Sequence, residues 1–159
     1  MTVELGIDFV ALVRFAFLAA ACGCLLYVSW QDWQTQRIRN RSVLVLLLLF
    51  FGWSAASGFE GIAHQAAAGS LLFVLGGTFW ALGLVGAGDA KLLFPVGLFL
   101  GWGNLMEFAI LLLVLSVVAY ILVKLPVARR SGKMEEIRTK GTFPYGVAIG
   151  FSAVIALLV

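Results

Sequence analysis

The sequence predicts an all-α integral membrane protein, built as a single six-helix transmembrane bundle with both termini outside. Of its 159 residues, 62% are hydrophobic and only 12% are charged, whereas soluble domains are roughly half apolar and about a quarter charged. A globule of this size could not bury so much apolar surface. High hydrophobicity excludes intrinsic disorder, and two cysteines are too few for a disulfide scaffold.

The apolar residues form six runs, and each is expected to be a helix because backbone polar groups in lipid must pair within their own segment. The expected spans are residues 9–30, 43–56, 66–85, 90–102, 108–123 and 144–159. The fourth span is short and contains Pro95. The first is too long for a typical signal peptide and is expected to remain in the mature protein. Six helices occupy nearly the whole chain, which predicts one domain over residues 1–159.

The distribution of basic residues predicts the orientation, because short cytoplasmic connections collect Lys and Arg. They lie after the first span, at the join of the third and fourth, and after the fifth: Arg37, Arg39, Arg41, Lys91, Lys124, Arg129, Arg130, Lys133, Arg138 and Lys140. The alternate connections contain no Lys or Arg. Arg14 is the exception, and its side chain is expected to snorkel toward the outer interface. Topology and anionic lipid headgroups explain the net charge of +3 without a nucleic-acid partner.

Two acidic residues are predicted at the inner ends of helices. Asp32 lies at the inner end of the first helix, and Asp89 lies at the inner end of the third or at the start of the fourth. Carboxylates at membrane depth are costly and usually functional. Two such carboxyl groups, when close, share one proton. The ionised member then activates a water, and the protonated member polarises a carbonyl. The alternative is that each aspartate caps a helix or pairs with a neighbouring arginine.

Glycines precede the second acid, in the segment Gly86, Ala87, Gly88 and Asp89. Glycine allows backbone conformations closed to other residues and lets another chain approach closely. We therefore expect Gly86 and Gly88 to leave room for a peptide beside the acid.

These residues resemble the type 4 prepilin peptidases, membrane aspartic proteases of the GxGD type. GAGD at Gly86–Asp89, with Lys91 close behind, resembles their second motif. Asp32 followed by Ile38 and Asn40 resembles the first, an aspartate followed by Ile-Pro-Asn, with Arg39 here at the proline position. A segment near the end of the sequence resembles the closing segment of the family, through Pro144, Tyr145, Gly146 and Ala148.

The resemblance implies a membrane-embedded aspartic endopeptidase with Asp32 and Asp89 as catalytic residues and no metal or cofactor. Its substrates would be type 4 prepilins or pseudopilins, whose short basic leader is removed at the cytoplasmic face of the bacterial inner membrane; pilus-assembly machinery and membrane lipid are further expected partners. Lys91 would either bias the ionisation of the pair or anchor its helix at the headgroups. Pro144, Tyr145 and Gly146 are expected to start a helix at the interface.

Longer members of that family carry paired CxxC motifs that bind zinc, and they also N-methylate the newly exposed residue. No CxxC occurs here. The chain is similar to the short, peptidase-only form of tight-adherence (Flp-type) pilus systems, which implies cleavage without methylation. Cys22 and Cys24 lie two positions apart on one helix and would make a poor metal pair.

Two other functions stay open. A small proton- or cation-coupled transporter could also use two aspartates at the inner membrane face, and transporters often contain broken helices. A non-catalytic membrane subunit of a secretion system is the second. Serine and zinc intramembrane proteases fit less well, because His64 is the only histidine and is expected outside, and no HExxH motif occurs.

Overall fold

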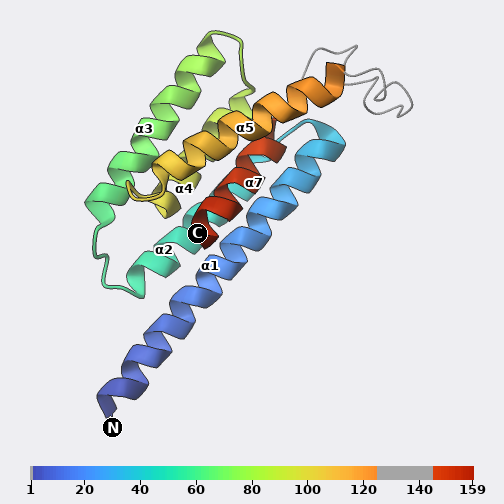
Figure 1. Ribbon diagram of the computed structural model, residues 1–159. Coiled ribbons are helices and arrows are strands. Elements are labelled where there is room, and N and C mark those ends of the chain that lie inside the picture. The colour runs from blue at the N-terminus through green and yellow to red at the C-terminus, as the bar shows by residue number, and fades with distance from the viewer. Residues whose placement is uncertain (1, 125–144) are drawn as a thin grey trace.

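The computed structural model describes residues 2–124 and 145–159, and this part of the chain is helical with short connections (Figure 1). Its six helices are α1 (Thr2–Thr35), α2 (Asn40–Ala55), α3 (Ile62–Ala81), α4 (Ala87–Leu100), α5 (Leu105–Lys124) and α7 (Tyr145–Leu158). No strand occurs in the described ranges. The predicted all-α class and the six helices are therefore confirmed.

Helix α1 is longer than expected at both ends, and so it includes Asp32 in its last turn. The predicted end at residue 30 was wrong because the polar segment that follows contains no glycine or proline to stop a helix. The helix continues until Gln36, which takes a left-handed φ of 50°. The other bounds differ from the predicted ones by a few residues, and the start of the last predicted span, Pro144, lies outside the described residues.

Helices α3 and α4 are also shifted along the chain relative to the predicted spans. Helix α3 ends at Ala81 instead of residue 85, because the next residues form a turn in which Gly83 has a φ of 73°. Helix α4 starts at Ala87 instead of residue 90, so Asp89 belongs to its first turn. Of the two predicted positions of Asp89, the end of the third helix and the start of the fourth, the second is therefore confirmed.

Two of the described helices are long and apolar enough to cross a membrane: residues Phe9–Thr35 and Ile62–Ala81. Three shorter apolar helices accompany them, at Asn40–Ala55, Leu105–Ile121 and Tyr145–Leu158. Length and composition thus agree with the predicted membrane class for two helices.

Helix α4 is the centre of the bundle, and most of its side chains are buried. It packs most extensively against α3, and it also contacts α2, α5 and α7. At the α3–α4 crossing a methyl group on Gly97 would lie 2.7 Å from the Cα of Gly69 and 2.9 Å from the carbonyl oxygen of Ala68. Small residues therefore let these two helices approach closely, as glycines do where helices associate in lipid.

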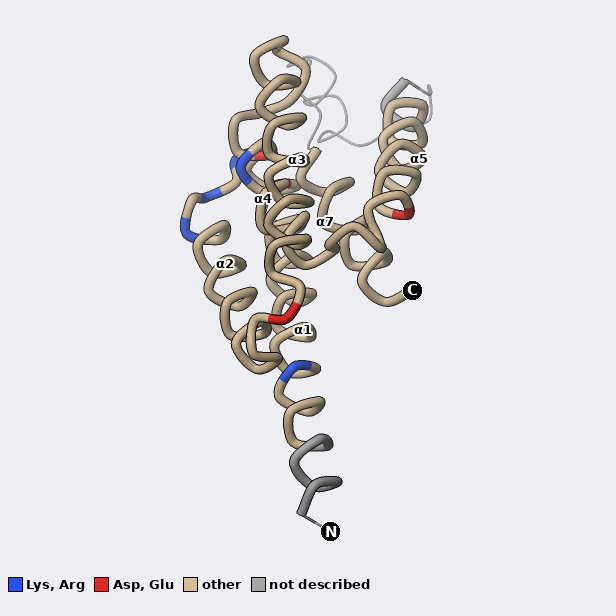
Figure 2. The backbone as a smooth tube through the Cα atoms, turned by 90° about the vertical axis from the view of Figure 1, so that its left-hand side faces the viewer, with Lys and Arg blue, Asp and Glu red and all other residues tan. Residues whose placement is uncertain are grey.

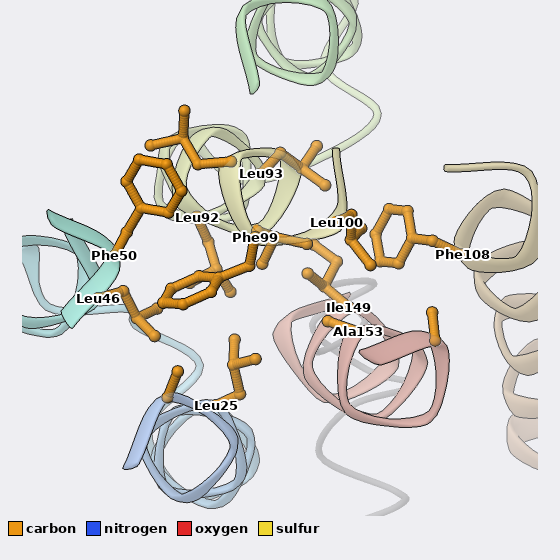
Figure 3. Packing of buried hydrophobic residues seen from close by; sticks show 14 of the residues in the cluster. Leu25, Leu46, Phe50, Leu92, Leu93, Phe99, Leu100, Phe108, Ile149 and Ala153 are labelled. Atoms are coloured by element: carbon orange, nitrogen blue, oxygen red, sulfur yellow. The ribbon is translucent and has the colours of Figure 1, made fainter. Parts of the chain in front are cut away.

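The apolar core lies around α4, between α1, α2 and α7 (Figure 3). Phe50 of α2 and Phe99 of α4 pack edge to face, with ring centroids 5.4 Å apart. On the other side of α4, Phe108 extends from α5 toward Leu100 (Figure 3). Helix α5 packs mainly on α7 and only slightly on α4. It is the least enclosed of the helices around the core.

Among the described residues, the basic side chains gather at one end of the bundle, with one exception. Figure 2 shows basic residues around the α1–α2 connection and the beginning of α4, with an acidic position in the α2–α3 connection at the other end. The exception, Arg14, has its guanidinium carbon 4.7 Å from the ring centroid of Trp53 in α2. This cation–π contact gives the half-buried arginine a partner within the bundle.

Candidate active site

Asp32 lies in the last turn of α1 against the beginning of α7. Its side chain is only 4% exposed. The carboxyl group accepts hydrogen bonds from the backbone N–H groups of Gly146 and Val147, which belong to the first turn of α7 and have no partner within that helix. Its Oδ2 atom has no hydrogen-bond partner. Asp32 thus caps a helix that is more than a hundred residues away in the sequence, and it still keeps one oxygen unused.

Asp89 has the same arrangement on its own helix. The backbone N–H of Gly86 donates to its Oδ2 atom over 3.2 Å, so the carboxylate caps the first turn of α4. The side chain is 8% exposed, and its Oδ1 atom is buried without a partner. The two carboxyl groups are near enough for the charge on Asp32 to act on Asp89. The fold therefore brings the two predicted acids into one site.

Ile38 connects the two halves of this site. A methyl group on Gly88 would lie 3.0 Å from its Cβ atom, and one on Gly146 would lie 3.0 Å from its Cδ1 atom. The same methyl group on Gly146 would come within 2.8 Å of Oδ2 of Asp32. The room at Gly88 is thus filled by Ile38 of this chain, and not left for a peptide as expected. Both glycines instead let the segments that carry the acids pack together.

Asn40 and Lys91 form a contact between α2 and α4 on the exposed surface near the site. The Nζ atom of Lys91 donates to Oδ1 of Asn40 over 3.4 Å, between exposed side chains. Asn40 is the first residue of α2, and Lys91 follows Asp89 by two positions in α4. The lysine therefore links the start of α4 to the start of α2 by a hydrogen bond. Neither predicted role of Lys91, biasing the ionisation of the acids or anchoring its helix at the headgroups, included this contact.

Arg39 occupies the N-cap position of α2 with φ −79° and ψ 137°. Proline fixes φ near −65 ± 15° and is common at extended positions before a helix. The backbone conformation that the family's proline would impose is therefore present with arginine in its place. No side-chain cap hydrogen bond forms at this residue.

The end segment contributes mainly through its backbone. Tyr145 begins α7, and Gly146 is buried beside Asp32. Pro144 lies outside the described residues. Within the described residues the helix begins at Tyr145, and the backbone N–H groups of Gly146 and Val147 in its first turn bind the acid.

Ser29 is a supporting residue that the sequence did not single out. Its hydroxyl group donates to the carbonyl oxygen of Leu25 over 3.0 Å and lies 3.4 Å from that of Gly146. A methyl group on Gly150 would collide with this hydroxyl oxygen. Ser29 therefore sets how α7 packs on α1, one turn before Asp32. Its three-residue spacing from Asp32 was the available signal, because that spacing places both residues on one helix face.

Capping explains one oxygen of each aspartate and leaves the other unexplained. A buried polar atom without a hydrogen bond costs about 1–3 kcal/mol. A purely structural cap would not need such an oxygen on each acid. The two oxygens without a partner, Oδ2 of Asp32 and Oδ1 of Asp89, are instead suited to bind a water or a polarised carbonyl.

Other reactive groups in the described residues lie outside this site. His64 is exposed in the first turn of α3, Cys22 and Cys24 are free and half-buried in α1, and no cluster of three or more potential metal ligands occurs among the described side chains. The two acids and the helix starts around them are therefore the candidate chemistry.

The model of the type IV leader peptidase family matches residues 19–124, which is more than half of the chain. The matched region includes Asp32, Ile38, Asn40, Asp89 and Lys91. The chain therefore belongs to the type IV leader peptidase family and is a peptidase. Comparison with curated proteins and with solved structures gives no match.

Proposed function

We propose that this peptidase is a membrane-embedded aspartic endopeptidase that removes the short basic leader from Flp-type prepilins or pseudopilins. Cleavage takes place at the cytoplasmic boundary of the bacterial inner membrane and is not followed by N-methylation. The observation that supports the proposal is a pair of buried aspartates, near enough for the charge on one to act on the other, each with one oxygen fixed at a helix start and the other without a partner.

In this mechanism Asp32 and Asp89 lie on either side of the scissile amide. The ionised carboxylate takes a proton from a water, which attacks the carbonyl carbon, while the protonated carboxyl group donates to the carbonyl oxygen. A tetrahedral intermediate forms without a covalent acyl-enzyme. The pair works with one proton between its members, so the rate falls when the pH is low enough to protonate both or high enough to ionise both.

The membrane orientation rests on the charge distribution. Basic residues flank the end of the bundle that holds the acids, and short cytoplasmic connections are the ones that collect Lys and Arg. A precursor with its apolar helix in the bilayer and its leader in the cytoplasm would present the boundary between them at this depth.

The test is cleavage of a purified Flp-type precursor by the protein in detergent. Asp32→Asn and Asp89→Asn should each lower the rate by at least about 100-fold, because asparagine can neither take nor supply the proton. Glu107→Gln is the matched control, since this acid lies in the first turn of α5 away from the site. It should cleave like the unchanged protein.

Each variant is checked for folding by its thermal unfolding midpoint in the same detergent. Two folded aspartate variants that cleave at the normal rate would exclude the aspartic mechanism. The mass of the new N-terminus, measured after incubation with a methyl donor, tests the second part of the proposal, and a methylated product would contradict it.

A further inference from the structure

A groove of about 330 Å³ opens between α3 and α5, with α4 and α7 as its floor. All four helices contribute to its lining, which includes Leu72 of α3, Asp89 of α4, Phe108, Leu113 and Ser116 of α5, and Tyr145 of α7. It exists because α5 packs on α7 and touches α4 only slightly, while α3 lies close along α4. In Figure 3, α3 lies above Leu93, and α5, which carries Phe108, lies to the right.

One ionisable carboxylate, Asp89, lines this otherwise apolar groove. It lies at one end of the groove, because Asp89 and Tyr145 are at the starts of α4 and α7, whereas Leu72 is in the middle of α3 and Phe108 is at the start of α5, which follows the far end of α4. The same side chain carries the buried Oδ1 atom that has no hydrogen-bond partner. The groove therefore leads from a reactive carboxyl group along an apolar wall.

The dimensions of the groove suit about two turns of helix. Phe108 and Ser116 of α5 both line it, and eight residues at 1.5 Å each span about 12 Å. A charged group in its apolar part would be costly, so the occupant must be uncharged there. It must also present a backbone amide at Asp89.

We propose that this groove between α3 and α5 binds the first two turns of the precursor's apolar helix, with the scissile bond at the Asp89 end. This inference rests on the proposed function and adds where the substrate helix lies. A peptide that reaches the acid and continues as an apolar helix matches both the buried carboxyl group and the apolar wall. A lipid chain would match the wall alone.

The first test narrows the groove without touching the acids. Leu113 lines it and is 66% exposed, while its neighbour Val114 is 50% exposed and is not part of the lining. Leu113→Trp should lower kcat/KM for the full precursor by about tenfold or more, because the larger ring takes space that the substrate helix needs, and a change of a few apolar contacts in a pocket has effects of this size. Val114→Trp adds at least as much bulk at a position outside the lining and should leave kcat/KM unchanged.

The second test measures binding without cleavage. A photo-crosslinking residue replaces Leu113 or Val114 in the inactive Asp89→Asn chain, which is then mixed with precursor in lipid nanodiscs. A crosslink from position 113 to the precursor's apolar helix, with little from position 114, supports the groove. Equal crosslinking from both positions, or crosslinks from position 113 to lipid or to a second copy of the chain, would overturn it.

The two proposals fail in different ways. If the unchanged protein does not cleave the precursor, the proposed function fails. If it cleaves and Leu113→Trp cleaves equally well, only the placement of the substrate in this groove fails.

Discussion

Gly146 is the residue on which the position of Asp32 most directly depends. A methyl group added to Gly146 would come within 2.8 Å of a carboxylate oxygen of Asp32 and 3.0 Å of Ile38. A side chain at this position must push the acid, Ile38 or the start of α7 away. The backbone N–H groups of Gly146 and Val147 that bind Asp32 would move with it.

We therefore expect Gly146→Ala to lower the cleavage rate by about 10- to 100-fold, since a displacement of about 1 Å in a catalytic group has effects of this order. Gly23→Ala is the control, because nothing lies within 4 Å of the added methyl group on α1. The measurement is the initial rate of precursor cleavage. A Gly146→Ala variant as fast as the Gly23→Ala variant would show that the position of Asp32 tolerates the change.

At Arg39 we expect a substitution to be tolerated, in contrast to Gly146, because the backbone of Arg39 already has a proline-like conformation. Arg39→Pro should keep full cleavage and raise the free energy of unfolding by about 0.4–1 kcal/mol, since proline restricts the unfolded chain. Gln36→Pro is the contrasting variant, because the φ of 50° at Gln36 is closed to proline. Denaturant unfolding and cleavage are measured together. A folded Arg39→Pro variant that cleaves slowly would instead assign a role to the arginine side chain.

At the scale of elements, the α3–α4 pair has the most extensive packing among the described helices, and its α4 carries Asp89. The closest approach is at Gly97, where an added methyl group would meet backbone atoms of Gly69 and Ala68. Backbone cannot move aside as a flexible side chain can. The two helices would have to separate along their length.

Gly97→Ala should therefore destabilise the protein by about 1–3 kcal/mol, which corresponds to a fall of several degrees in the thermal midpoint. Gly77→Ala, on the same helix pair, has nothing within 4 Å of the added methyl group and should be neutral or slightly stabilising. Thermal unfolding in detergent compares the two. Equal midpoints would mean that the α3–α4 crossing is loose enough to absorb a methyl group.

At the scale of the whole molecule, the charge distribution predicts which end of the bundle faces the cytoplasm. Glu60 in the α2–α3 connection and Leu82 in the α3–α4 connection are both exposed, and they lie at opposite ends of α3. Each position is changed to cysteine, one at a time, in a chain with Cys22 and Cys24 changed to serine. The reactivity of each single cysteine then shows on which side of the membrane it lies.

We expect Glu60→Cys to react with a membrane-impermeant maleimide in intact cells after the outer membrane is opened. Leu82→Cys should react only after the inner membrane is also opened. The reverse pattern would place the acids on the outer side and contradict the proposed cytoplasmic cleavage, whereas reaction of both in intact cells would contradict a crossing by α3.

Composition and short motifs were enough to predict the helical class, the six helices of the described residues and the two candidate acids, because these depend on local sequence. It could not determine that α1 continues to Thr35, because no local stop signal marks that end. Helix bounds elsewhere moved by a few residues for similar reasons.

The contacts of the motif residues could not be predicted in the same way, because they depend on how the helices pack. Ile38 fills the room beside Gly88, Lys91 reaches Asn40, and the first turn of α7 binds Asp32. The groove beside Asp89 also depends on how far α5 stands from α3, which no local pattern encodes. These contacts join segments that are distant in the chain, and their geometry follows from how whole helices pack, not from the residues next to them in sequence.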